Sequence, residues 1–254
     1  GMFDQYVPPA HIERMIERGA SVSLDGESRV MTVLFADIKG FTALSEGRSA
    51  QELKHLLNEL FTPLTEKVLD HQGTIDKYVG DMIMAFWNAP LVDARHREHA
   101  LDAALAFGPE LVRINALLAR RDLPLVDMGL GINTGLMNVG DMGSAFRRAY
   151  TVLGDAVNLG SRIEGLTRHY GVHMLVGEQT RDEVDGYLFR FIDRVIVKGR
   201  QQTVRLYEPI CRTSEATVEI ERRLLHYHGA YWMYAERDWD RAAKAFDRLL
   251  EDEP

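Results

Sequence analysis

Apolar and polar residues alternate along the chain in patterns that switch between strand-like and helix-like up to about residue 210. The unbroken apolar run at 29–37 predicts a strand that is buried on both faces. Ser49 and Glu52 form a capping box that begins a long helix, whose leucines recur at helical spacing. Two apolar runs joined by a glycine-containing turn predict a β-hairpin over 75–86.

The middle of the chain predicts a long helix followed by two strands. Residues 94–121 have helical character, and Gly108-Pro109 should kink or split this helix. Strands are expected over 126–132 and 136–139, joined through Asn133-Thr134-Gly135. The remaining expected elements are a strand at 149–153, a helix at 155–169, a strand at 173–176, a helix at 178–185, and strands at 188–197 and 203–209. This alternation predicts an α/β or α+β domain with a single sheet.

The two ends of the chain depart from this pattern. Residues 1–27 are expected to be a linker that approaches a main domain at 28–212. Residues 213–254 show helical periodicity without a strand signal, and from Tyr234 onward they resemble the second half of a tetratricopeptide unit. Plain amphipathic helices are the alternative interpretation of this segment.

Composition excludes several classes of protein. The chain has 254 residues and a formal net charge of −8, so it offers no overall basic surface for nucleic acid. Its single cysteine, Cys211, rules out an intrachain disulfide framework and fits a reducing compartment. No apolar run reaches the length of a membrane span. We therefore expect this domain to lie in the cytoplasm.

Two carboxylates occupy positions at the ends of predicted strands. Asp37 closes the strand at 29–37, and Asp81 follows Gly80 at the tip of the hairpin. Isolated aspartates are usually exposed loop acids or ion-pair partners, but two of them at packed strand ends can hold a hard divalent cation. After Asp37 the chain turns through Phe41 and Thr42 into a helix, whose free N–H groups would favour a phosphate.

A second polar pair lies on the helix that begins after Gly154. Asn158 and Arg162 are four residues apart and share one face of this helix, which differs from its apolar stripe. The pair could be a solvated face or a site. Arginine with asparagine suits charge that develops on a phosphorus atom next to a sugar.

Together these residues resemble the class III nucleotide cyclases, the catalytic domain of adenylyl and guanylyl cyclases. The resemblance covers roughly residues 28–210, with its motifs in order and at the spacing of the family. Its motifs are Phe35 to Thr42, Lys77 to Asp81, Gly154 to Arg162 and Val197 to Arg200. The resemblance implies a ferredoxin-like α+β fold (an α/β sandwich), with a mostly antiparallel sheet flanked by helices and a short helical segment at the C-terminus.

The resemblance also implies a role for each matching residue. Asp37 and Asp81, with the Ile38 carbonyl, would hold two Mg²⁺ or Mn²⁺ ions at each active site. Asn158 would orient the ribose and Arg162 would stabilise the charge at the α-phosphate. The remaining substrate-binding residues would be Lys198 and Arg200, which would hold the terminal phosphates, together with Phe41 and Thr42 in the first motif.

Base choice follows from hydrogen bonding at two further positions of the family pattern, Lys77 and Thr151. Lysine can donate to N1 of adenine, and a threonine hydroxyl can accept from its 6-amino group. Guanine presents the reverse pattern and calls for an acid at position 77, so Lys77 disfavours GTP. The resemblance thus implies an adenylyl cyclase that converts ATP to cyclic AMP and pyrophosphate. Guanylyl cyclase and a catalytically silent dimerisation module are the alternatives.

The resemblance further implies a homodimer whose active sites are shared between two copies of the chain. Tyr6-Val7-Pro8-Pro9 looks like the coupling linker that follows a sensor domain in relatives, so an upstream sensor or membrane anchor is expected in the full protein. The C-terminal helices are a possible surface for a protein partner.

Overall fold

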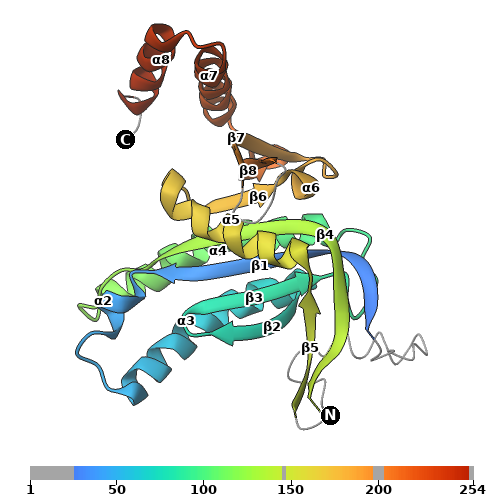
Figure 1. The fold of residues 1–254 in the computed structure, drawn as a ribbon. Coiled ribbons are helices and arrows are strands. Elements are labelled where there is room, and N and C mark those ends of the chain that lie inside the picture. Colours follow the sequence, from blue (N-terminus) through green and yellow to red (C-terminus); the bar gives the residue numbers. More distant parts are fainter. Residues whose placement is uncertain (1–25, 145–146, 197–202, 252–254) are drawn as a thin grey trace.

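A single twisted sheet with helices on both faces forms the main body of the computed structural model, which describes residues 26–144, 147–196 and 203–251 (Figure 1). The strands are β1 (Glu27–Lys39), β2 (Thr74–Val79), β3 (Met82–Trp87), β4 (Asp127–Ser144), β5 (Arg147–Leu153), β6 (Met174–Gly177), β7 (Tyr187–Ile196) and β8 (Thr203–Arg212). The helices are α2 (Phe41–Ser45), α3 (Ala50–Asp70), α4 (His96–Ala119), α5 (Asp155–Tyr170), α6 (Glu178–Arg181), α7 (Val218–Ala235) and α8 (Trp239–Glu251), with a 3₁₀ turn at Thr213–Glu215.

The strands follow the order β2-β3-β1-β4-β6-β8-β7, and β5 pairs with β4. The pairing of β4 with β6 is parallel, and the other recorded pairings are antiparallel. The predicted hairpin is confirmed as β2 and β3, and the predicted capping box is present between Ser49 and Glu52 at the start of α3. The expected α+β fold with a mostly antiparallel sheet is therefore confirmed.

The side chains of β1 divide between two apolar layers because successive residues of a strand point to opposite faces. Leu34, Ala36 and Ile38 belong to the core that includes α3 and α4. Val33 and Phe35 belong to a second cluster that includes residues of α5. Asp37 is the next residue in that second series, so its side chain lies on the α5 side of the sheet.

Helix α5 lies very close to β4 because β4 carries glycines beneath it. A Cβ atom at Gly131 would lie 2.3 Å from the backbone nitrogen of Glu164, and one at Gly129 would lie 2.6 Å from Glu164 Oε1. A larger residue at Gly131 would push α5 away from the sheet, because its Cβ atom would meet the helix backbone. This close approach determines how near the polar side chains of α5 lie to the end of β1.

One expectation for the middle of the chain was wrong. The two strands expected around Asn133-Thr134-Gly135 are one strand, β4, which pairs with β1 without interruption from Asp127 to Val139. The turn-like residues serve packing: the Asn133 amide donates to the Ala156 carbonyl, and the Thr134 hydroxyl lies within hydrogen-bond distance of other buried threonines. Burial of these side-chain hydrogen bonds overrides the turn propensity.

The helix expected to kink or split at Gly108-Pro109 is not split, since α4 runs through both residues, and the kink stays a prediction. Phe107 and Ile114 are buried on either side of the proline. Their packing against the core holds both halves of the helix on the sheet. The helix expected at 178–185 is shorter than predicted, because α6 ends at Arg181.

The C-terminal helices α7 and α8 pack against each other and project beyond the β7–β8 ribbon (Figure 1). Tyr227 of α7 meets Phe246 of α8, with their ring centroids 5.9 Å apart. Tyr231 of α7 packs edge-on against Phe191 of β7, with their ring centroids 4.8 Å apart, and so joins the two C-terminal helices to the sheet.

The domain boundary at residue 213 and the tetratricopeptide resemblance stay predictions, as does the linker at 1–27, nearly all of which lies outside the described residues. None of the helices in the described ranges is long and apolar enough to cross a bilayer.

Candidate active site

Asp37 and Asp81 are brought together by the pairing of β1 with β3. Asp37 is opposite Met82, the residue after Asp81, and the Ile38 N–H donates to the Asp81 carbonyl at 3.2 Å. Gly80 has a φ of 62°, a left-handed conformation that glycine adopts easily and that the tight turn before Asp81 requires. The two aspartates expected at strand ends therefore lie side by side.

The environment of Asp37 disfavours its ionised form when no cation is present. Burial raises the pKa of the Asp37 carboxyl and the neighbouring charge of Asp81 raises it further, while Arg168 and Lys39 act in the opposite direction. The Arg168 guanidinium, on α5, donates to Asp37 Oδ2 at 2.8 Å. Asp37 is thus a partly buried carboxylate with both an acidic and two basic neighbours.

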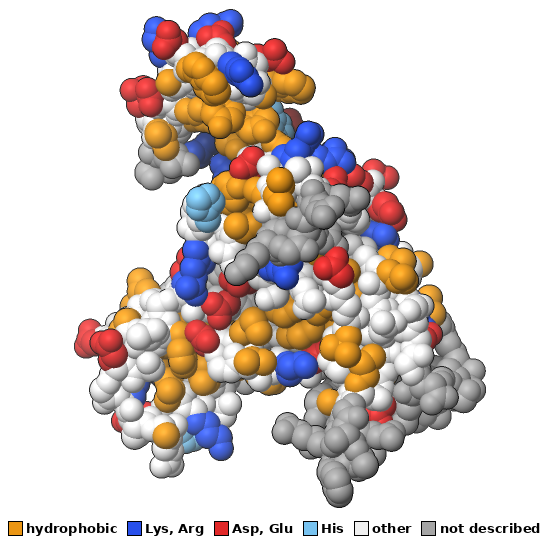
Figure 2. Space-filling model, in the orientation of Figure 1, with side chains coloured by type: hydrophobic (Ala, Val, Ile, Leu, Met, Phe, Trp, Pro, Cys, Tyr) orange, Lys and Arg blue, Asp and Glu red, His pale blue; other side chains and the backbone are white. Residues whose placement is uncertain are grey.

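Glu164 of α5 adds a third acid to this region. Burial and the charge of Asp37 raise its pKa to about 7, and its Oε1 atom is buried without a hydrogen-bond partner among the described residues. On the face shown in Figure 2, acidic and basic side chains adjoin beside α5. The concentration of acids over one strand end is the feature that a bound cation would relieve.

These residues fit a hard divalent cation. Asp37 and Asp81 supply only oxygen donors, which is the chemistry that Mg²⁺ and Mn²⁺ prefer. Within the described ranges no three His, Cys, Asp or Glu side chains form a metal-binding group. An ion here would therefore need further ligands beyond these two carboxylates, such as backbone carbonyls, water or substrate phosphates.

The two expected base-reading residues, Lys77 and Thr151, also come together. They lie on β2 and β5, and both contact the carboxylate of Asp76. The Thr151 hydroxyl donates to Asp76 Oδ2 at 2.5 Å, and Lys77 Nζ lies 3.1 Å from Asp76 Oδ1. Thr151 is buried, whereas the Lys77 side chain is 47% exposed.

Asn158 and Arg162 lie on α5 as expected, on a different face from its buried stripe. Asn158 is exposed and Arg162 is half-buried, whereas Leu159 and Ile163 are buried. No hydrogen bond or ion pair involves the side chains of Asn158 or Arg162 within the described part of the chain. Both side chains are therefore available to a ligand.

The other expected substrate-binding residues differ in their settings. Phe41 packs partly against the main core at the start of α2, and Thr42 is exposed on that helix. The helix in which the expected phosphate-binding N–H groups lie is short, because α2 has only five residues, and phosphate binding there stays a prediction. Lys198 and Arg200 lie outside the described residues.

The sequence reasoning did not find Asp76, Glu164 or Arg168. Asp76 stands directly before Lys77, and its role depends on a local irregularity of β2 that no periodicity reveals. Glu164 and Arg168 follow Arg162 at two and six residues, so they could be placed near Asp37 only once the position of α5 over β1 was known. The helical spacing of Glu164 and Arg168 is the only signal the sequence carries for them.

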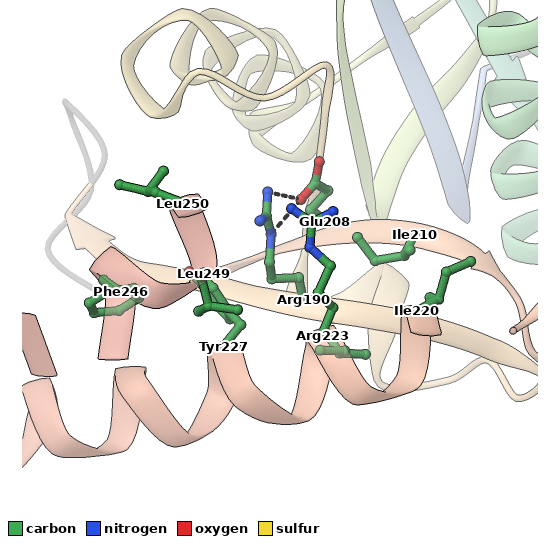
Figure 3. A pocket seen from close by; sticks show the side chains of 10 residues that line it. Arg190, Glu208, Ile210, Ile220, Arg223, Tyr227, Phe246, Leu249 and Leu250 are labelled. Atoms are coloured by element: carbon green, nitrogen blue, oxygen red, sulfur yellow. Dashed lines mark hydrogen bonds and ion pairs between the residues drawn. The ribbon is translucent and has the colours of Figure 1, made fainter. Parts of the chain in front are cut away.

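A separate cavity of about 440 Å³ lies between the C-terminal helices and the β7–β8 ribbon. Figure 3 shows its apolar wall from α7 and α8 and, on the opposite side, Arg190 ion-paired with Glu208, with Nη2 and Oε2 2.5 Å apart. The Arg190 guanidinium also lies over the Tyr227 ring, 5.0 Å from its centroid. None of the expected site residues in the described ranges lines it, so this cavity is distinct from the acidic site.

The chain matches the family model of the adenylate and guanylate cyclase catalytic domain over residues 26–208. It is 38% identical over 212 residues to adenylate cyclase 1 of Rhizobium meliloti (strain 1021) and 34% identical over 216 residues to an adenylate cyclase of Anabaena cylindrica. These matches cover 82% and 81% of this chain but only 31% and 42% of those two proteins. The chain thus spans less than half the length of these relatives.

Solved structures agree with these sequence matches. The adenylyl cyclase CyaB from P. aeruginosa superposes with a TM-score of 0.70 at 29% identity, over 76% of this chain and 100% of that one. The guanylyl cyclase Cya2 superposes with a TM-score of 0.69 at 29% identity, over 76% and 97%. The chain therefore belongs to the class III nucleotide cyclase family, as an adenylate and guanylate cyclase catalytic domain.

Proposed function

We propose that this domain converts ATP to 3′,5′-cyclic AMP and pyrophosphate in intracellular signalling. The observation that carries this proposal is the convergence of Lys77 and Thr151 on one buried carboxylate, Asp76. A lysine and a threonine side by side can donate to N1 of adenine and accept from its 6-amino group. A guanine in the same place would set its N1–H against an ammonium group, and such unmatched polar groups are costly.

The acidic site would serve the reacting end of the nucleotide. Asp37 and Asp81, with the Ile38 carbonyl, would hold two Mg²⁺ or Mn²⁺ ions. When bound, such ions make the ribose 3′-hydroxyl more acidic and offset the charge of the triphosphate. The 3′-oxygen forms a bond to the α-phosphorus while the bond from this phosphorus to the pyrophosphate oxygen breaks, and the hydroxyl proton is lost to solvent.

Residues of α5 would act on the same reaction. Asn158 would orient the ribose, and Arg162 would offset the negative charge that grows on the α-phosphate. Lys198 and Arg200 would hold the terminal phosphates, with Phe41 and Thr42 close to the triphosphate. The exposed positions of Asn158 and Thr42 support direct contact with a nucleotide.

We also propose that two copies of the chain share two equivalent sites. The acids of one copy would face the base-reading, Asn158 and Arg162 residues of the other. Exposed apolar side chains on β2, β4 and β5 support a surface that a second copy covers. They are Tyr78, Val79, Leu136 and Leu153.

Guanylyl cyclase activity is the second candidate, because the Cya2 structure is as similar in fold and identity as that of CyaB. The test is to incubate the purified chain with Mn²⁺ and either ATP or GTP and to quantify both cyclic nucleotides. Cyclic AMP formed from ATP well in excess of cyclic GMP formed from GTP supports the proposal. Predominant cyclic GMP would establish the second candidate, and no product from either nucleotide would indicate a silent dimerisation module.

The proposed setting of the domain is the cytoplasm, where ATP is available and where the unpaired Cys211 would stay reduced. An upstream sensor or membrane domain would regulate it. The C-terminal helices would recruit a protein partner, and the half- to two-thirds-exposed Trp232 and Trp239 on α7 and α8 support such a contact.

A further inference from the structure

A β-bulge in β2 places two consecutive side chains next to each other. Ile75 pairs with Ala85 and Lys77 pairs with Met84, so Asp76 is the extra residue between them. In a regular strand Asp76 and Lys77 would point to opposite faces, whereas a bulge re-aims a side chain. Here it allows Lys77 Nζ to lie 3.1 Å from Asp76 Oδ1.

The Asp76 carboxylate is buried and is surrounded by donors. Its side chain is 1% exposed, and its Oδ2 atom accepts from the Thr151 hydroxyl at 2.5 Å and from the Val152 N–H at 3.3 Å. Its Oδ1 atom has Lys77 as its sole partner within the described ranges. Three converging donors suit an ionised carboxylate, which can only accept hydrogen bonds.

This arrangement fixes the direction of the Thr151 hydroxyl. A hydroxyl has one proton and two lone pairs, and an acceptor-only carboxylate takes the proton. Thr151 then presents only lone pairs to a nucleotide base. We propose that Asp76 is a positioning residue for base selection, which keeps Thr151 a hydrogen-bond acceptor and so favours adenine over guanine.

The chemistry of the two bases explains the discrimination. The 6-amino group of adenine donates to an acceptor, whereas O6 of guanine would face the lone pairs of Thr151 without a proton between them. Lys77 can keep one proton on Asp76 and give another to the base, since an ammonium group has three donors. This inference rests on the proposed function, because it assumes that Lys77 and Thr151 contact the base.

The test is the ratio of kcat/KM for ATP to kcat/KM for GTP in the full chain and in Asp76→Asn. An asparagine that keeps its oxygen on Thr151 sets its NH₂ group against Lys77, whereas a flipped one donates to Thr151 and frees the hydroxyl proton for O6 of guanine. We expect the ratio to fall by about tenfold. A variant that only loses folded protein would lower both rates equally and leave the ratio unchanged.

Two further variants test whether the change in the ATP/GTP ratio arises at Asp76 and through Thr151. Asp102→Asn is the matched control: Asp102 is a partly buried carboxylate of α4 that accepts from Tyr187 and Arg212 and contacts neither Lys77 nor Thr151, so its change should leave the ratio unchanged. Thr151→Val removes the hydroxyl that Asp76 orients. In a Thr151→Val background, Asp76→Asn should change the ratio no further, because residues that act as a unit are not additive.

Neutron diffraction of wild-type crystals provides a measurement that needs no variant. A deuteron on Thr151 Oγ1 that points to Asp76 Oδ2 supports the inference, and one that points away from Asp76, or a deuteron on Asp76 itself, overturns it. An unchanged ratio in Asp76→Asn, or an equal change with and without the Thr151 hydroxyl, also overturns it while leaving the cyclase activity intact. A wild-type chain that cyclises neither nucleotide would instead overturn the proposed function and this role with it.

Discussion

The Arg168 guanidinium on α5 donates to the Asp37 carboxylate at the end of β1, with Nη2 and Oδ2 2.8 Å apart. This ion pair occupies an oxygen of one of the two acids proposed to hold metal. Burial and the charge of Asp81 raise the pKa of Asp37, and Arg168 opposes that rise. A divalent cation that binds Asp37 must therefore compete with a cation of the chain itself.

Arg168→Ala should lower the Mn²⁺ concentration that gives half-maximal cyclase activity. The Arg168 side chain is 61% exposed, and exposed ion pairs contribute about 1 kcal/mol or less, so we expect a change of about two- to fivefold. Titration of activity with Mn²⁺ measures it. Arg121→Ala is the control, because the Arg121 side chain, in the turn after α4, is similarly exposed and pairs with Glu59 of α3 at 2.6 Å. An unchanged or higher metal requirement in Arg168→Ala alone would refute the competition.

Asp37→Asn should abolish most of the cyclase activity without lowering the stability of the metal-free protein. Loss of the carboxylate should reduce cyclic AMP formation by about 100-fold or more, because the developing charge is no longer balanced. The thermal midpoint without metal should stay the same or rise, since burial and Asp81 already disfavour the charge of Asp37. The rise in midpoint that Mn²⁺ causes in the wild type should be lost, as measured by calorimetry. A large destabilisation without metal would contradict this assignment.

Lys77→Glu should not by itself produce a guanylyl cyclase. The new carboxylate would lie next to the buried Asp76, where Lys77 Nζ now stands 3.1 Å from Oδ1, and like charges so close disfavour each other. ATP turnover should fall by about tenfold or more without a gain in GTP turnover. The double variant Lys77→Glu/Asp76→Asn should form more cyclic GMP than the single one. Efficient GTP turnover by Lys77→Glu alone would count against this electrostatic constraint.

His96 should make the fold sensitive to acid. It is buried at the start of α4 next to the Thr32 hydroxyl, 2.8 Å from its Nδ1 atom. Burial, with the charge of Arg97, lowers its pKa from 6.5 to about 4. The unfolded chain therefore binds this proton near pH 6.5 while the folded chain excludes it until about pH 4, so stability is lost as the pH falls through this window.

The His96→Gln variant isolates this contribution. The free energy of unfolding of the wild type should fall relative to that of the variant by on the order of 2 kcal/mol between about pH 7.5 and pH 4.5. Urea unfolding at a series of pH values measures both proteins. Parallel pH dependence of the two proteins would show that His96 is not the group responsible.

Local sequence signals predicted those parts of the fold that depend on local physics. The capping box of α3 and the hairpin around Gly80-Asp81 are fixed by residues close in sequence, and both were predicted. Asn133-Thr134-Gly135 carries the composition of a turn but lies within β4. The Asn133 amide group donates to α5 and the Thr134 hydroxyl bonds to a distant threonine, and a local pattern cannot include either contact.

In the candidate site, too, local motifs were predicted and contacts between distant elements were missed. The motifs placed Asp37, Asp81, Lys77 and Thr151 in the sequence, and the structure brings each pair together. Asp76 was missed because a bulge aims its side chain beside Lys77, and a bulge breaks the two-residue period on which strand prediction rests. Arg168 was missed because its contact with Asp37 depends on how closely α5 lies on the glycines of β4.

ATP cyclisation at sites shared by two copies is tested by complementation between two inactive variants. Asp37→Ala lacks a metal-binding acid and Arg162→Ala lacks the arginine proposed for the α-phosphate. If each site takes these residues from different copies, a mixed dimer contains one intact site and one doubly impaired site. An equimolar mixture, in which half of the dimers are mixed, should form cyclic AMP from ATP at about a quarter of the wild-type rate. No recovery at any mixing ratio, with mixed dimers shown to form, would contradict the account.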